Sequence, residues 1–316
     1  AFGLLGVFTA LTSILAPIAA FTYPVAIVLP KNDIDALGIV RLSFYLSLAI
    51  SALFALAIWA GGNWLTSILN AESIAAYLFL IPLVMLFSAW TQIGQQWLVR
   101  AEEFRLYARI AVIQSLLVNI AKTGFGWFNP IAAVLIIIAT LGNLLNSVML
   151  FIGAKIRYRD SPGHATDAVK TTIKQLALRH RDFPFYRTPK VVVDSMSAAL
   201  PVLGLTALIG PAEAGFFSLA MSVLSMPVAL IATSVEKVLY PKLSRAANES
   251  KKLTPLVLKS AMGLVLVSSL PFALIAILGP SLFEIVFGRN WSAAGVYSQW
   301  LVLWLFTSFV IRAFYC

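Results

Sequence analysis

The sequence is poor in charged residues and in cysteine. Only 11% of its 316 residues are Asp, Glu, Lys or Arg, whereas 60% are hydrophobic and the mean hydropathy is +0.90. This composition excludes a soluble globular protein. The one cysteine, Cys316, excludes a disulfide framework. His164 and His180 have no cysteine cluster near them, so we expect no metal site and no cofactor.

Catalytic motifs are absent as well. The sequence contains no P-loop, no HExxH and no GxSxG. The gaps between apolar runs on the predicted outer side offer only Glu72, Glu213 and Glu284, which are far apart in sequence. We therefore expect a protein that is not an enzyme. A membrane glycosyltransferase or polysaccharide polymerase is an alternative, but it would require a sizeable outer loop with acidic or arginine clusters.

Long apolar runs dominate what is present. Each run is about long enough to cross ~30 Å of hydrocarbon as a helix. The runs cover residues 3–29, 37–60, 75–98, 107–128, 131–154, 189–210, 214–239, 254–279 and 294–315. The expected fold is therefore all-α, a polytopic transmembrane helical bundle.

The basic residues are distributed asymmetrically between the gaps. If the gaps are assigned alternately to the two sides of a membrane, all 23 lysines and arginines except Lys122 and Arg289 fall on one side. This is the positive-inside pattern, and it predicts that the basic side is cytosolic. It also accounts for the net charge of +10 without nucleic acid, since anionic membrane lipids are the expected partner of cytosolic basic loops.

Two parts of the sequence resemble each other in order. Phe2–Gly6 and Ala214–Ser218 each open an apolar run with an internal proline, and the runs end at Leu29–Lys31 and Tyr240–Lys242. The offset of about 211 residues indicates an internal repeat. An even number of spans separates the copies, so the repeat is parallel, with an axis along the membrane normal.

The repeat predicts two lobes. We expect an N-terminal lobe at 1–154 that lacks its first helix and a C-terminal lobe at 189–316 that lacks its last two helices. Residues 155–188 form the predicted cytosolic linker. Within it Val169, Ile173 and Leu176 recur at helical spacing, which predicts a short helix lying in the membrane interface.

Polar residues inside the apolar runs are the candidate substrate-binding residues. Gln92 and Gln95 share one run, and Asn119 and Lys122 share the next. Amides hydrogen-bond helices together as readily as they line a cavity, so both interpretations stay open. Lys122 would lie deep in the membrane, where a cation either faces the bundle interior and binds an anionic group or extends to the interface. Arg41, close to the cytosolic boundary, has the same two interpretations.

Asp194 is the one fair candidate for ion coupling. It lies near the cytosolic end of its apolar run. A carboxylate there could bind a coupling ion, pair with a cation or remain an unpaired boundary group.

Three segments resemble a known family. These are FGLLGVFTALTSILAPIAAFTYPVAIVLPK at 2–31, the stretch from Phe183-Pro184 to Tyr240-Pro241, and FGRNWSAAGVYSQWLVLW at 287–304. They are similar to the polysaccharide-biosynthesis (O-antigen-type) lipid-linked oligosaccharide flippases of the multidrug/oligosaccharidyl-lipid/polysaccharide exporter superfamily. One departure is Thr22-Tyr23-Pro24, where family members often have Arg-Tyr-Glu.

The resemblance implies a two-lobed exporter of twelve or more spans in a bacterial or archaeal inner membrane. Such a protein flips a polyprenyl-diphosphate-linked oligosaccharide to the outer leaflet by alternating access, for surface polysaccharide (lipopolysaccharide) biosynthesis. Its implied partners are the lipid-linked oligosaccharide, membrane lipids and polysaccharide assembly proteins. A multidrug or metabolite cation-coupled antiporter of the same superfamily is the alternative.

Overall fold

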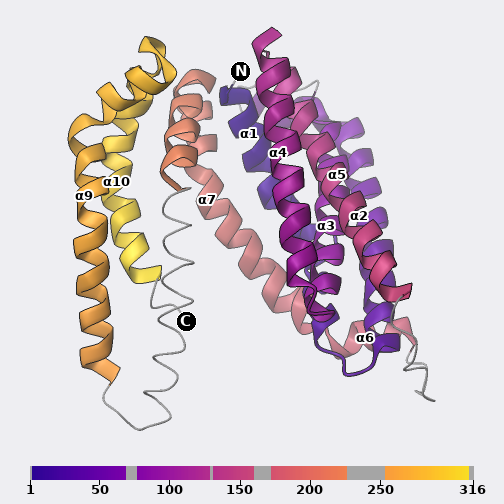
Figure 1. Cartoon of the computed structure of the whole chain (residues 1–316). Helices are drawn as coiled ribbons and strands as arrows, with labels where there is room; N and C mark the ends of the chain where they lie inside the picture. Colours follow the sequence, from indigo (N-terminus) through magenta and orange to yellow (C-terminus); the bar gives the residue numbers. More distant parts are fainter. Residues whose placement is uncertain (1, 69–76, 129–130, 160–171, 226–252, 313–316) are drawn as a thin grey trace. The chain divides into compact units, whose positions relative to one another are not determined.

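The structure, a computed structural model, describes residues 2–68, 77–128, 131–159, 172–225 and 253–312. All regular structure in these ranges is helical, which confirms the predicted all-α fold (Figure 1). The main helices are α1 (Phe2–Leu15), α2 (Asp33–Ile68), α3 (Leu80–Arg100), α4 (Phe104–Phe128), α5 (Ala132–Arg159), α6 (Ile173–Arg179), α7 (Thr188–Leu208), α9 (Leu253–Phe287) and α10 (Ser292–Arg312). A further helix covers residues 211–225.

Five helical segments are long and apolar enough to cross a membrane. They are Asp33–Gly61, Phe104–Gly126, Ala132–Ala154, Phe183–Leu208 and Ser268–Phe287. The first four overlap the predicted runs at 37–60, 107–128, 131–154 and 189–210, and the last overlaps 254–279. Residues 226–239 of the predicted run 214–239 lie outside the described residues. The chain is a multi-pass membrane protein.

The first apolar run, at 3–29, does not form one continuous helix. After α1 come the short 3₁₀ helices η1 (Ala16–Ile18) and η2 (Tyr23–Val28), separated by Phe21 and Thr22 in the left-handed conformation, with φ of 48° and 52°. Proline at residues 17 and 24 removes backbone donors on either side of this break. Left-handed non-glycine residues are strained, so the surrounding structure must hold them.

Hydrogen bonds to a distant segment hold the break. The buried Thr22 Oγ1 lies 3.1 Å from Thr188 Oγ1 at the start of α7 and 3.3 Å from the carbonyl oxygen of Phe183. One residue on, Tyr23 Oη donates to the carbonyl oxygen of Ala177 in α6, at 3.1 Å. The interrupted run is thereby joined to the segment just before α7.

Helices α2 to α5 pack together, with α3 contacting both α2 and α5 and α4 contacting α5. Helix α3 lies close to α5 at Gly94, where an added Cβ would lie 2.7 Å from Leu150 Cβ. Small residues allow helix backbones to approach in this way in membranes. Phe8, Met85 and Ile136 form a buried core between α1, α3 and α5.

A short helix is present in the predicted linker. Figure 1 shows α6 at the end of the long helices, and its Leu176, 1% exposed, fits over Gly38 of α2, where no Cβ could be accommodated without a shift of Leu176. Thr172 and Gln175 form a capping box at its start. Val169, the first residue of the predicted apolar stripe, lies outside the described residues.

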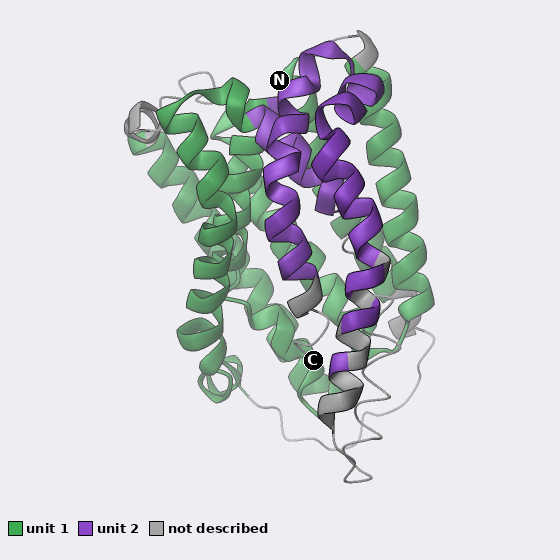
Figure 2. Ribbon diagram, turned by 90° about the vertical axis from the view of Figure 1, so that its left-hand side faces the viewer, with its two compact units in different colours: residues 1, 3–214 green, residues 2, 215–316 purple. Residues whose placement is uncertain are grey.

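The chain divides into two compact units, residues 3–214 and 215–316, with Phe2 grouped with the second (Figure 2). In the second unit α9 and α10 pack side by side. Glycine at residue 279 allows this close contact, because an added Cβ there would lie 2.7 Å from the carbonyl oxygen of Gly295. Gln299 Nε2 donates to the carbonyl oxygen of Ala276 at 2.8 Å. The predicted lobe boundaries and their parallel repeat remain predictions.

Candidate functional site

The candidate residues on α3 and α4 lie at two levels of the first unit. Both Gln92 and Gln95 are half-buried on α3, Lys122 is half-buried on α4 and Asn119 is exposed. The three-residue turn 101–103 joins the two helices, so they are antiparallel neighbours. At 1.5 Å per residue, Lys122 lies about 15 Å further along the axis than Gln92. The structure does not bring the four residues into one cluster.

Asn119 and Lys122 share one face of α4, three residues apart. Asn119 Nδ2 donates to the carbonyl oxygen of Ser115 at 2.8 Å and to Ser115 Oγ at 3.2 Å. Both bonds stay within α4. Lys122 makes no hydrogen bond or ion pair with any residue in the described ranges. Within the part of the chain that the structure describes, its three ammonium donors are therefore unused.

The remaining candidates lie elsewhere in the same unit. Arg41 is exposed in the first turns of α2. Asp194 Oδ2 lies 3.5 Å from Lys190 Nζ, one turn earlier on α7, and both side chains are mostly exposed. Asp194 is thus paired with a cation of its own helix, the second of the interpretations that the sequence left open.

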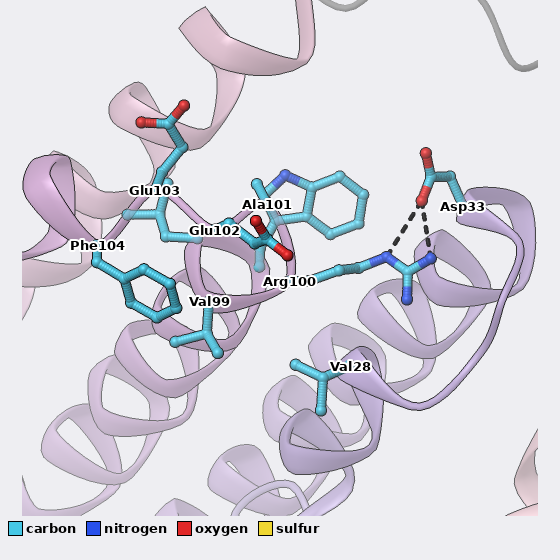
Figure 3. A pocket seen from close by; sticks show the side chains of 10 residues that line it. Val28, Asp33, Val99, Arg100, Ala101, Glu102, Glu103 and Phe104 are labelled. Atoms are coloured by element: carbon cyan, nitrogen blue, oxygen red, sulfur yellow. Dashed lines mark hydrogen bonds and ion pairs between the residues drawn. The ribbon is translucent and has the colours of Figure 1, made fainter.

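A cavity with charged lining residues lies at the turn between α3 and α4. It has a volume of about 720 Å³ and is lined by Val28, Asp33 and residues 97–104 (Figure 3). Arg100, 14% exposed, extends across it toward Asp33, whose Oδ1 accepts from Nε at 3.1 Å and from Nη2 at 2.8 Å. Both bonds end on the same carboxylate oxygen, and each is charge-assisted.

Arg100 also donates hydrogen bonds to backbone carbonyls at the end of η2 and just after it. Its Nη1 donates to the carbonyl oxygens of Ile27, at 3.2 Å, and Pro30, at 2.6 Å, and its Nη2 donates to that of Lys31, at 3.4 Å. The sequence interpretation missed this role. The signal that could have found it is the proline-interrupted stretch at residues 24–30, whose carbonyls need donors from another segment.

The carboxylates around this cavity do not form a metal centre. Glu102 is exposed and Glu103 is half-buried on the turn, with Asp33 opposite (Figure 3). Across the described ranges, no group of three His, Cys, Asp or Glu side chains could hold a metal ion. The guanidinium of Arg100 is already hydrogen-bonded to Asp33 and to backbone carbonyls. The cavity therefore marks a contact that stabilises the fold, with Glu102 and Glu103 at its edge.

A second, apolar cavity of about 200 Å³ lies between α2, α3 and α5. Its lining residues are Leu37, Val40, Ile93, Gly94, Trp97, Phe151 and Ala154. Apart from the Trp97 indole, all its lining side chains are apolar, so it does not suit a sugar or a diphosphate.

His180 follows α6 at the edge of the linker segment. Its ring packs edge-on against Phe183, with ring centroids 6.2 Å apart. Burial lowers the pKa of His180 below its ordinary value near 6.5, and Arg179 lowers it further, whereas Asp182 and Asp35 of α2 oppose this. The imidazole is therefore neutral at pH 7.

A comparison with protein families adds what the geometry alone does not decide. A family model described as polysaccharide biosynthesis protein matches residues 1–295. The chain belongs to this family. One curated relative, the succinoglycan biosynthesis transport protein ExoT of Rhizobium meliloti (strain 1021), is 23% identical over 300 residues, which cover 93% of this chain and 57% of the relative. The chain thus spans little more than half the length of that relative. No solved structure matches the chain.

These findings confirm the resemblance drawn from residues 2–31, 183–241 and 287–304. The family match extends over both compact units except for the last 21 residues of the second.

Proposed function

We propose that this chain belongs to a transporter, not an enzyme, that flips a polyprenyl-diphosphate-linked oligosaccharide to the outer leaflet of a bacterial or archaeal inner membrane. The family match over residues 1–295 carries the proposal. The word transport in the name of the curated relative supports it, as do the five segments able to cross a membrane. Alternating access of two repeated lobes, driven by an ion gradient, is the mechanism we infer.

The residue proposed to bind the diphosphate is Lys122. A half-buried ammonium in a membrane span is costly unless it meets an anion or water, and α4 offers no acid to neutralise it. Asn119, one turn before it, would donate to sugar hydroxyls after exchanging its bond to Ser115. Gln92, Gln95 and Arg41 lie nearer the cytosolic end of the first unit, where they would contact the substrate as it enters.

Substitution of Lys122 tests this proposal. In cells that lack their own flippase, Lys122→Ala should reduce surface polysaccharide at least tenfold at unchanged protein level, whereas Lys122→Arg should retain most of it. Arg105→Ala, which removes an exposed charge from the same helix, is the matched control. Equal polysaccharide in Lys122→Ala and the control would remove Lys122 from the site.

The antiporter alternative predicts a different effect of substituting Asp194. A cation-coupled antiporter requires a membrane carboxylate, so Asp194→Asn should abolish its transport. In the flippase the Asp194–Lys190 pair is a solvated helix contact, and the same substitution should leave polysaccharide export unchanged.

A further inference from the structure

The inner face of α6 is fixed against the first unit. Leu176 occupies the space over Gly38 of α2, and the carbonyl oxygen of Ala177 accepts from Tyr23 Oη. His180 and Phe183 follow Leu176 at four and seven residues and are also partly covered. These contacts determine which side of the segment faces away from the helices.

The opposite face carries a mixture of basic and apolar side chains. Lys174, Leu178 and Arg181 recur at four and three residues and are all exposed, Leu178 by 60%. The π-helix η4 (Phe183–Arg187) continues this side with Phe185, 71% exposed, and Tyr186, 76% exposed. We name Lys174, Leu178, Arg181, Phe185, Tyr186 and Arg187 the linker surface.

The charge of this segment is positive. Residues 172–190 contain five lysines or arginines and one acid, Asp182. Arg179 lies 3.9 Å from Asp35, and Lys190 pairs with Asp194. Among the described residues, the three basic residues of the linker surface form no ion pair and are available to another molecule. Arg187 is oriented by the Phe183 ring, whose centroid is 5.8 Å from its Cζ.

The linker surface lies next to a membrane span. The segment Phe183–Leu208 is long and apolar enough to cross the bilayer, and Phe185, Tyr186 and Arg187 near its start belong to the linker surface. Basic side chains with exposed aromatic and aliphatic ones are typical of segments at the headgroup level. The charge pattern predicts that this side is cytosolic, where the leaflet is anionic.

We propose that the linker surface binds anionic phospholipid headgroups of the cytosolic leaflet. Lys174, Arg181 and Arg187 contact the headgroup phosphates, while Leu178, Phe185 and Tyr186 lie among the first acyl carbons. Because α6 contacts α2 through Leu176 and Gly38, bound lipid stabilises the linker in its docked position. The proposal does not depend on which substrate is transported.

Lipid titration of the purified protein tests this. Thermal unfolding is measured while dioctanoyl phosphatidylglycerol or dioctanoyl phosphatidylcholine is added to the detergent solution. The wild-type midpoint should rise with phosphatidylglycerol at concentrations where phosphatidylcholine has little effect. In Lys174→Gln/Arg181→Gln the apparent affinity for phosphatidylglycerol should fall about 25-fold, since each basic residue near an anionic surface contributes about fivefold.

The matched control removes two charges elsewhere on the same side. Arg105→Gln/Arg109→Gln changes two exposed arginines of α4 and should keep the wild-type affinity. Equal effects of the two lipids, equal losses in the two double variants, or an unchanged affinity in Lys174→Gln/Arg181→Gln would overturn the proposal; the last result would leave this surface to a protein partner. Glycerol 3-phosphate should not reproduce the stabilisation, and if it did, the site would be one for free anions.

A spin label provides a second readout that needs no charge change. Cys316 is the only cysteine, so Leu178→Cys in a Cys316→Ser background can be labelled at one position. In phosphatidylglycerol-containing vesicles the label should be more accessible to oxygen than to a water-soluble nickel complex. Greater accessibility to nickel would show that residue 178 faces water and would overturn the proposal. If the wild-type protein bound phosphatidylglycerol in this way but did not restore polysaccharide export in cells that lack their own flippase, only the proposed function would be contradicted.

Discussion

Two regions of the first unit both carry polar side chains, but they use them differently. Around Arg100, polar groups bond to other segments, as Arg100 does to Asp33 and Thr22 does to Thr188. On the Lys122 face of α4, Asn119 bonds only to its own helix, and Lys122 bonds to nothing in the described ranges. The first region is built to hold the fold. The second makes no such bond to another segment within the described residues, so we expect substitutions in the two regions to separate stability from transport.

The largest loss of stability is expected for Arg100→Gln. The change leaves Asp33 and the carbonyls of Ile27 and Pro30 without their shared donor, which should cost about 2–4 kcal/mol. Arg100→Lys should recover little, because one ammonium cannot reproduce the planar fork of five donors. Thermal or denaturant unfolding in detergent measures this, with Arg105→Gln as the control within ±0.5 kcal/mol. Equal stability of the two variants would contradict the structural role of Arg100.

A smaller loss is expected for Gly38→Val. The new side chain would collide with Leu176 and push α6 from α2, at a cost of about 1–3 kcal/mol. Hydrogen exchange should rise over residues 173–179 before any other helix responds. Gly61→Val is the matched control on the same helix, since nothing lies within 4 Å of an added Cβ there. If the two variants behaved alike, Leu176 would not be what fixes α6.

Acid should weaken the same contact. Because burial lowers the pKa of His180 in the folded protein, the neutral form favours folding. Its contribution is fully present above pH ~6.5 and is lost as the pH falls through the lower folded pKa. Protection of α6 against hydrogen exchange should therefore decrease between pH 7.5 and pH 5, after correction for the intrinsic rate. In His180→Gln this pH dependence should be reduced, and an unchanged dependence would assign it to another group.

The smallest effect on stability is expected on the Lys122 face. Asn119→Ala removes bonds that lie within one helix on an exposed position, so the free energy of unfolding should change by less than about 0.5 kcal/mol. A loss above about 1 kcal/mol would show that Asn119 holds α4 in place and would remove the contrast between the two regions.

Much of the helical layout could be predicted from hydropathy and charge. Helices α2, α4, α5 and α7 are continuous apolar runs between polar gaps, and length with composition suffices to find them. The helical spacing of Val169, Ile173 and Leu176 predicts a short helix, and α6 covers Ile173–Arg179. The family resemblance came from short motifs and is confirmed over residues 1–295.

The break after α1 and the role of Arg100 could not be predicted in the same way. Hydropathy treats residues 3–29 as one run. The break at Thr22 is held by hydrogen bonds to Phe183 and Thr188, more than 160 residues away, which hydropathy does not register. Arg100 was counted among the cytosolic charges, since a charge count does not reveal which carbonyls a guanidinium will meet. Likewise, helical spacing could group Gln92 with Gln95, but it could not determine how far along the helix axes these residues lie from Lys122. That axial distance depends on where the turn at 101–103 reverses the chain.

The bonds of Arg100 have a consequence for how the protein is made. The carbonyl of Ile27 is bonded by a side chain 73 residues further along the chain. At about 5–20 residues per second, the ribosome delivers that arginine some 4–15 s after the isoleucine. During this interval the carbonyls of Ile27 and Pro30 lack the Arg100 donor and can accept from water or lipid headgroups instead. The final backbone conformation at the end of the first apolar run is therefore reached only after α3 has been synthesised.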